Sequence, residues 1–157
     1  MSKCPIQRAL NRLRLFAGLP VPNAVLWRDG KPDFRATDPE KFLYHFKHRL
    51  CAVCGTKLGM SCYWIGGGRS AVSHYFTDGP MHQLCAEVSI SHCPFLNGQR
   101  LHFRGDDIQG IPEQNNESRP ERMFLLRGDT SALTLHQIGP ESIVLYAGQR
   151  LTSVKEF

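Results

Sequence analysis

Two pairs of residues in the middle of the chain have the types and the spacing of metal ligands. Cys51 and Cys54 are separated by two residues and are followed by Gly55. His82 and Cys85 form a second pair with the same separation. The thiolates of a Cys-x-x-Cys pair can reach one ion across a tight turn, and a glycine allows the backbone to turn sharply. Three thiolates and one imidazole make a closed tetrahedral site, so these four residues are predicted to hold one structural Zn²⁺.

Two alternatives compete with this interpretation of the Cys-x-x-Cys pair. Buried cysteines can acquire such a spacing by chance, although a second pair disfavours chance. A redox-active pair normally begins a helix after a strand, whereas Cys51 and Cys54 follow a predicted helix. Cys93 lies eight residues beyond Cys85, roughly 12 Å along a helix, which is too far to share its ion unless the helix breaks. Cys4, Cys62 and Cys93 are therefore expected to be packing residues.

Some histidines suggest other chemistry. His45 and His48 are three residues apart on a predicted helix, which could suit a metal, but an exposed helix face is the simpler expectation. His74 lies near the end of a predicted strand and could be the general base of an HNH-type nuclease. Such nucleases usually carry an Asn and a second His on the following helix, and the predicted helix from Met81 to Cys93 contains no Asn. The nuclease is therefore the alternative function and a non-catalytic protein the preferred one.

The elements before the cysteine pair are predicted from local signals. Apolar residues at helical spacing predict a helix over residues 5–17. Two short runs at 24–28 and 33–36 flank an Asp-Gly turn and predict a hairpin. A second helix begins near Pro39, capped by Asp38 or by a capping box at residues 37–40, and runs to about Arg49.

The elements after the cysteine pair predict how the ligands are brought together. Residues 58–65 form a strand, three glycines make a turn, and residues 71–76 form the return strand. A helix then begins near Pro80, placing His82 and Cys85 on one face of its first turn. The order knuckle, β-hairpin, helix is that of a treble-clef zinc finger.

The whole chain is expected to be α+β, a single small domain organised around this treble-clef-like zinc finger. Residues 1–19 are predicted as a basic N-terminal helix, and residues 20–157 as one domain with a zinc-finger core at 51–96. A loop at about 105–122 is expected to be flexible because much of it lacks apolar residues. The tail is predicted to contain strands at 123–126 and 132–136, a short helix after Pro140 and a last turn at Thr152.

Composition and charge limit the function further. The 157 residues are 41% apolar and 21% charged, which is ordinary for a globular domain and argues against disorder. No apolar run approaches the ~18 residues of a membrane span, and the N-terminus lacks a secretory signal. We therefore expect a cytoplasmic protein with reduced thiols and no membrane partner.

The net charge of +5 is unevenly distributed. Residues 1–50 carry ten Lys and Arg against four Asp and Glu, whereas residues 106–157 carry five against eight. A basic N-terminal part favours nucleic acid or another acidic surface as the partner. The candidate nucleic-acid-binding residues are Arg8, Arg12, Arg14, Arg28, Arg35, Lys47 and Arg49.

Several motifs between residues 20 and 100 resemble those of a group of uncharacterised bacterial and phage proteins. They are the stretch from Pro20-Val21-Pro22 to Arg35, Cys-x-x-Cys-Gly-x-x-Leu-Gly at 51–59, Pro-Met-His-x-x-Cys-Ala at 80–86, and Cys-Pro-Phe-Leu at 93–96. Gly79 departs from the pattern, where a second proline is expected. The resemblance implies a bacterial, phage or mobile-element setting and no established activity. The predicted function is a non-catalytic zinc-binding module for a bacterial host protein or nucleic acid, in the host cytoplasm.

Overall fold

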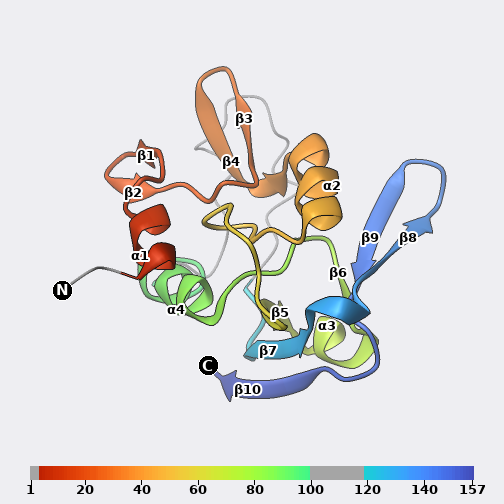
Figure 1. Cartoon of the computed structure of the whole chain (residues 1–157). Coiled ribbons are helices and arrows are strands. Elements are labelled where there is room, and N and C mark those ends of the chain that lie inside the picture. Colours follow the sequence, from red (N-terminus) through yellow and green to blue (C-terminus); the bar gives the residue numbers. More distant parts are fainter. Residues whose placement is uncertain (1–3, 100–118) are drawn as a thin grey trace.

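The computed structural model describes residues 4–99 and 119–157 (Figure 1). Within them the fold is α+β, as predicted, and every paired strand is antiparallel to its neighbour. In chain order the elements are α1 (Pro5–Leu10), β1 (Leu15–Phe16), β2 (Leu19–Pro20), β3 (Val25–Arg28), β4 (Lys31–Thr37), α2 (Pro39–His48), β5 (Ser61–Gly67), α3 (Gly68–Ser73), β6 (Tyr75–Phe76), α4 (Gln83–His92), β7 (Met123–Asp129), the 3-10 helix η3 (Thr130–Ala132), β8 (Thr134–Ile138), β9 (Ser142–Tyr146) and β10 (Thr152–Glu156). None of the helices in the described ranges has the length and hydropathy needed to cross a membrane.

The core is built around β5. Its side chains alternate between buried and half-buried, and Trp64 is 1% exposed. The Trp64 ring stacks on Phe76 with centroids 4.9 Å apart. β7 pairs with β5 along its whole length and is flanked on its other side by β10. Helix α1 contributes Leu10, α4 contributes Ala86 and β9 contributes Leu145 to the same core, so segments from both halves of the chain share it.

The N-terminal helix is shorter than predicted. α1 ends at Leu10, and residues 15–20 form the small β1–β2 hairpin instead of continuing the helix. Ala17 and Gly18 have φ values of 50° and 77°, the left-handed pair that a tight hairpin turn requires. Phe16 packs edge-on against Trp27 with centroids 6.4 Å apart. This tertiary contact outweighs the local helical periodicity, so the expected basic helix over residues 1–19 is wrong beyond its first turns.

The next two elements follow their local signals. β3 and β4 form a hairpin through Asp29 and Gly30, both with positive φ. α2 is capped by Asp38, whose carboxylate accepts the backbone N–H groups of Glu40 and Lys41. The alternative capping box does not form, because the hydroxyl of Thr37 donates to Asp78 instead.

The predicted return strand at 71–76 is wrong. Residues 68–73 form α3, and the two residues of β6 pair with β9 rather than with β5. One edge of β5 is filled by β7, and among the described residues its other edge makes a single bridge, between Tyr63 and Met81. The hairpin expected between the cysteine pair and α4 is thereby replaced by long-range pairing.

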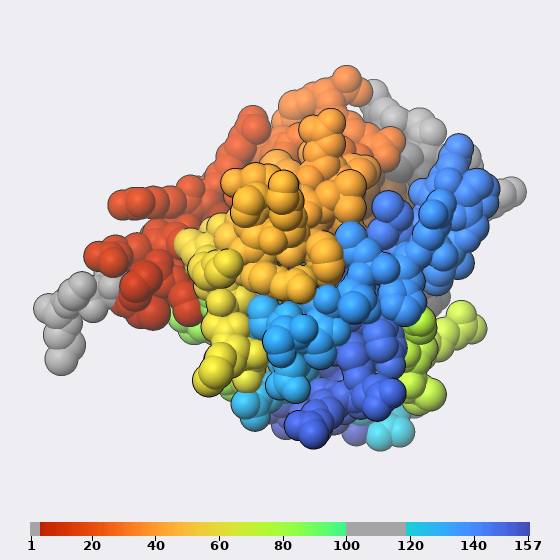
Figure 2. Space-filling view, turned by 45° about the vertical axis from the view of Figure 1, so that its right-hand side comes forward, coloured from red at the N-terminus to blue at the C-terminus, as the bar shows by residue number. Residues whose placement is uncertain are grey.

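The tail contains more strand than predicted. β7 and β8 confirm the two expected strands, whereas β9 and β10 stand where a helix after Pro140 and a last turn at Thr152 were predicted. The β8–β9 hairpin lies beside α2 on the face shown in Figure 2, blue against orange. Leu43 of α2 and Ile143 of β9 line a cavity of about 210 Å³ there. The expected loop at 105–122 falls, up to residue 118, outside the described residues.

Candidate metal centre

The first pair of cysteines lies in a tight turn between α2 and β5. The N–H of Gly55 donates to the carbonyl of Cys51 at 2.9 Å, and the N–H of Cys51 donates to Thr56 at 2.8 Å. Gly55 has a φ of 74°, so the glycine predicted to allow this turn is used in the left-handed conformation. The N–H of Cys54 also points to the sulfur of Cys51 at 3.5 Å. The local sequence therefore folds both thiols toward one point.

The second pair lies at the start of α4. His82 is the N-cap residue and Cys85 the third residue of the helix, slightly later than a start at Pro80 would give. The N–H of Ala86 donates to the carbonyl of His82 at 3.0 Å, closing the first turn. Residues three apart in this turn lie on one face, as predicted for the two ligands.

Backbone hydrogen bonds join the two halves of the site. The N–H of Ala52 donates to the carbonyl of Pro80 at 2.9 Å. Tyr63 and Met81 exchange two N–H···O=C bonds of 2.8 and 2.9 Å. The first bond holds the start of α4 against the cysteine turn, and the other two hold it against β5, without the predicted hairpin.

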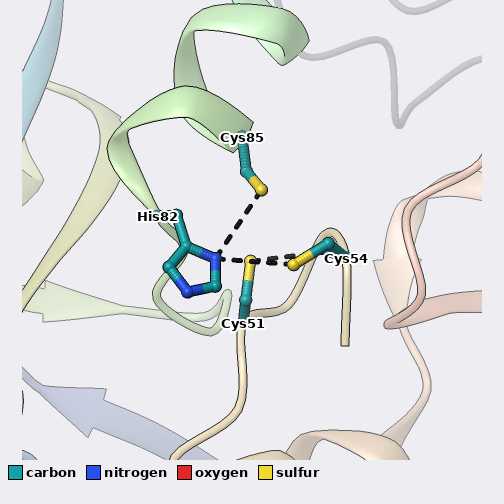
Figure 3. A group of neighbouring side chains, drawn as sticks. All are labelled: Cys51, Cys54, His82 and Cys85. Carbon is teal, nitrogen blue, oxygen red and sulfur yellow. Dashed lines mark hydrogen bonds between the residues drawn. The ribbon is translucent and has the colours of Figure 1, made fainter. Parts of the chain in front are cut away.

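The four ligand atoms converge as the sequence predicted (Figure 3). They lie within 4.8 Å of one another, and Cys51 and Cys85 are fully buried. The Nδ1 atom of His82 lies 3.4 Å from the sulfur of Cys54 and 3.8 Å from that of Cys85. Tetrahedral Zn–S and Zn–N bonds would place a sulfur and a nitrogen about 3.6 Å apart. The cluster can therefore hold one metal ion with little rearrangement.

Two contacts around the cluster orient its ligands. The Nε2–H of His82 donates to the carbonyl of Lys57 at 2.9 Å, which leaves Nδ1 facing the sulfurs. The hydroxyl of Thr56 lies 3.1 Å from the sulfur of Cys54 and can donate to its thiolate. Partners of this kind fix the orientation of a ligand and increase its basicity.

The members of the cluster shift one another's pKa values. Contacts with the sulfurs of Cys51 and then Cys54 raise the pKa of His82 to about 10. Contacts with Cys51 and then Cys85 lower the pKa of Cys54 below its usual value, whereas Cys51 and Cys54 raise the pKa of Cys85. In the ion-free protein the group therefore favours a thiolate beside an imidazolium. Metal binding would release these protons.

The other thiols lie outside this cluster. Cys62 is fully buried on β5, where burial raises the pKa of its thiol to about 11. Its sulfur contacts the carbonyl of Gly128 at 3.8 Å. Cys93 ends α4 and is half-buried, and Cys4 is exposed. All three are placed as packing or surface residues.

The two histidines of α2 differ from the expected exposed face. His48 is exposed, but His45 is only 5% exposed, and its Nδ1 atom is buried without a hydrogen-bond partner among the described residues. Burial and then Lys41 lower the pKa of His45. His74, the candidate base of the nuclease alternative, ends α3 with a φ of 63° and donates from Nδ1 to Gly148 at 2.8 Å. It does not join the four-residue cluster.

The candidate nucleic-acid-binding residues differ in their contacts and in their exposure. Arg28 and Arg35 both face Asp33, and Arg49 donates to the carbonyls of Phe46 and Leu133. The contacts of the half-buried Arg35 and Arg49 support the fold, whereas Arg28 makes its contact at the surface. The side chains exposed to solvent are those of Arg8, Arg12, Arg14, Arg28 and Lys47.

Two further residues lie near Arg12 and Arg14 but are not among the candidates taken from the sequence. Lys41 and Trp27 line one cavity together with these two arginines. They come from α2 and β3, so no motif in the sequence connects them with residues 12–14.

Comparison with known proteins gives no match, whether to a protein-family model, a curated protein or a solved structure. The site is therefore interpreted from the geometry of its own residues.

Proposed function

We propose that the protein is a non-catalytic binding module that is stabilised by one structural Zn²⁺ and binds nucleic acid. The observation that carries the zinc assignment is the convergence of three sulfurs and one imidazole nitrogen within 4.8 Å. Soft thiolate ligands in a tetrahedral set favour zinc over the hard cations Mg²⁺ and Ca²⁺. Four protein ligands leave no open position for a reactive water, which supports a structural ion.

The proposed metal site has a treble-clef-like arrangement. Its ligands come in the expected order, two from a turn and two from a helix start. The bridge between Tyr63 and Met81 takes the place of the hairpin that normally connects them. Cysteines bind zinc as thiolates and not as disulfides, so this proposal places the working protein in a reducing compartment such as the cytoplasm.

Nucleic acid is proposed as the partner because of the charge distribution. Residues 1–50 hold ten of the 19 Lys and Arg residues, and five of the candidate binding side chains there are exposed. A concentration of exposed positive charge attracts phosphates and makes affinity depend on salt. An acidic protein surface would be attracted by the same charges, and the binding experiment separates the two partners.

Two measurements test the proposal. Elemental analysis of the purified protein should find about one zinc per chain, since the site offers one tetrahedral ligand set. A labelled oligonucleotide should bind with an affinity that falls as salt rises. A zinc content near zero would contradict the metal assignment, and binding of an acidic peptide but of no oligonucleotide would contradict the partner.

The nuclease alternative is tested separately. A plasmid is incubated with the protein and added Mg²⁺ or Mn²⁺, and the wild type is compared with His74→Ala. The proposal expects no cleavage by either protein. Cleavage that is lost in His74→Ala would establish the nuclease instead.

A further inference from the structure

A second cavity lies outside the four-ligand cluster, between the N-terminal segment and the start of α2. Its volume is about 220 Å³. Among its lining residues are Arg12, Arg14, Asn23, Trp27 and Lys41.

The charges around this cavity favour an anion. Arg12, Arg14 and Lys41 contribute three cations, and none of the described lining residues is acidic. Like charges gathered around one cavity repel each other, and an anion bound among them would remove that repulsion. In nucleic acids the anionic groups are the backbone phosphates, and arginine and lysine side chains bind them through charge-assisted hydrogen bonds.

An aromatic surface stands beside the cations. The guanidinium carbon of Arg14 lies 3.7 Å from the ring centroid of Trp27, which holds the charged group in place. Phe16 packs edge-on against the same Trp27 side chain, with ring centroids 6.4 Å apart. Unpaired bases stack on aromatic rings and on arginine planes, whereas bases inside a duplex are not available for this contact.

We propose that this cavity binds a backbone phosphate of single-stranded nucleic acid, with an adjoining base stacked on the guanidinium group of Arg14, which itself lies over the Trp27 ring. The proposal rests on the proposed function and names the site and the form of nucleic acid. Pockets for whole small molecules usually enclose ~300–1,000 Å³. The smaller volume here suits one phosphate and sugar of a longer chain.

The metal site supports one wall of the cavity. The N–H of Asn23 donates to the carbonyl of Val53, which lies between the two cysteine ligands of the turn, at 2.8 Å. The ammonium group of Lys41 donates a hydrogen bond to the carbonyl of Asn23 at 2.9 Å. The cysteine turn therefore positions Lys41 through Asn23.

Affinity measurements test the site with variants matched in charge. A labelled single-stranded oligonucleotide is titrated with the zinc-loaded protein at several salt concentrations. Arg12→Gln and Arg14→Gln should each weaken binding about fivefold and reduce the salt slope by about 0.7. Lys31→Gln removes the same charge from an exposed side chain in the basic half, but Lys31 is neither a candidate binding residue nor part of the cavity lining, and the change should alter affinity less than about twofold.

Tryptophan fluorescence gives an independent readout. The chain has two tryptophans, and Trp64 is 1% exposed, so a change on binding reports on Trp27. The oligonucleotide should quench this fluorescence, and Trp27→Phe should abolish the change. A matched duplex should bind more weakly, and inorganic phosphate or AMP should compete only at much higher concentration. Equal affinity for AMP or for the duplex would overturn the single-stranded assignment.

The outcomes separate this site from the general function. If Lys31→Gln weakens binding as much as Arg12→Gln, or if Trp27 does not respond, the cavity is not the site, although nucleic-acid binding stands. If no oligonucleotide binds even at about 50 mM salt, both proposals fail.

Discussion

The imidazole of His82 donates its Nε2 hydrogen to the carbonyl of Lys57 at 2.9 Å, and this bond determines which ring nitrogen faces the sulfurs. A carbonyl oxygen can only accept, so Nε2 keeps its proton and Nδ1 is left for the metal. The ring orientation is therefore set before an ion binds.

Removal of a thiol ligand should release the metal. Cys85→Ser replaces a fully buried thiolate by a hydroxyl that binds zinc poorly, and the zinc content should fall from about one per chain toward zero. Loss of zinc should also unfold at least the 51–96 region, as measured by circular dichroism. Cys62→Ser is the matched control, because it should cost about 1–3 kcal/mol yet keep the metal. Zinc loss in Cys62→Ser together with retention in Cys85→Ser would refute the ligand assignment.

Replacement of His82 should weaken zinc binding less than replacement of a cysteine. His82→Ala removes the nitrogen ligand, and a water can fill the position, so affinity should fall without complete loss of the ion. His82→Cys should restore a four-ligand site. Competition with a chromogenic chelator measures the three affinities, and His82→Ala with unchanged affinity would exclude His82 as a ligand.

Gly55→Ala should disturb the cysteine turn. Gly55 has a φ of 74°, and an added Cβ would lie 3.2 Å from the side chain of Asn23. An L-residue in this conformation costs about 1–2 kcal/mol, and the turn that aligns Cys51 and Cys54 would be strained. Both the urea midpoint and the zinc affinity should decrease. Gly59→Ala, with nothing within 4 Å of its Cβ position, is the control.

Gly128→Ala should destabilise the core. An added Cβ would lie 2.9 Å from the Cζ3 atom of Trp64, a ring that is 1% exposed and stacked on Phe76. Overpacking of this kind costs about 1–3 kcal/mol. The free energy of unfolding from urea titration at saturating zinc measures the loss, and wild-type stability in this variant would contradict the packing described.

Stability should fall below neutral pH partly because of His45. Burial lowers its pKa, so the unfolded chain binds a proton more readily than the folded one. The stabilisation is complete above the unfolded value of about 6.5 and is lost as pH falls through the lower folded value. At saturating zinc, the urea midpoint of His45→Leu should decline less than that of the wild type between about pH 7.5 and 5.5. His48→Leu, on the exposed side of the same helix, should follow the wild type.

Local signals in the sequence predicted the ligands and the turns around them. Cys51, Cys54 and Gly55 fold through hydrogen bonds within six residues, and His82 and Cys85 are related by one helical turn. The cap at Asp38 formed for the same reason, because its partners are its immediate neighbours. Such interactions depend little on the rest of the chain.

Only the tertiary structure decided the partner of β5, the burial of His45 and the cavity beside Trp27. Cys62 and Gly128 are 66 residues apart, yet they pair across β5 and β7 and leave residues 71–76 without the predicted partner. An amino-acid sequence specifies spacing and preferred backbone angles over a few residues. The choice among possible strand partners depends on the apolar surface that the whole fold buries, which local spacing does not contain.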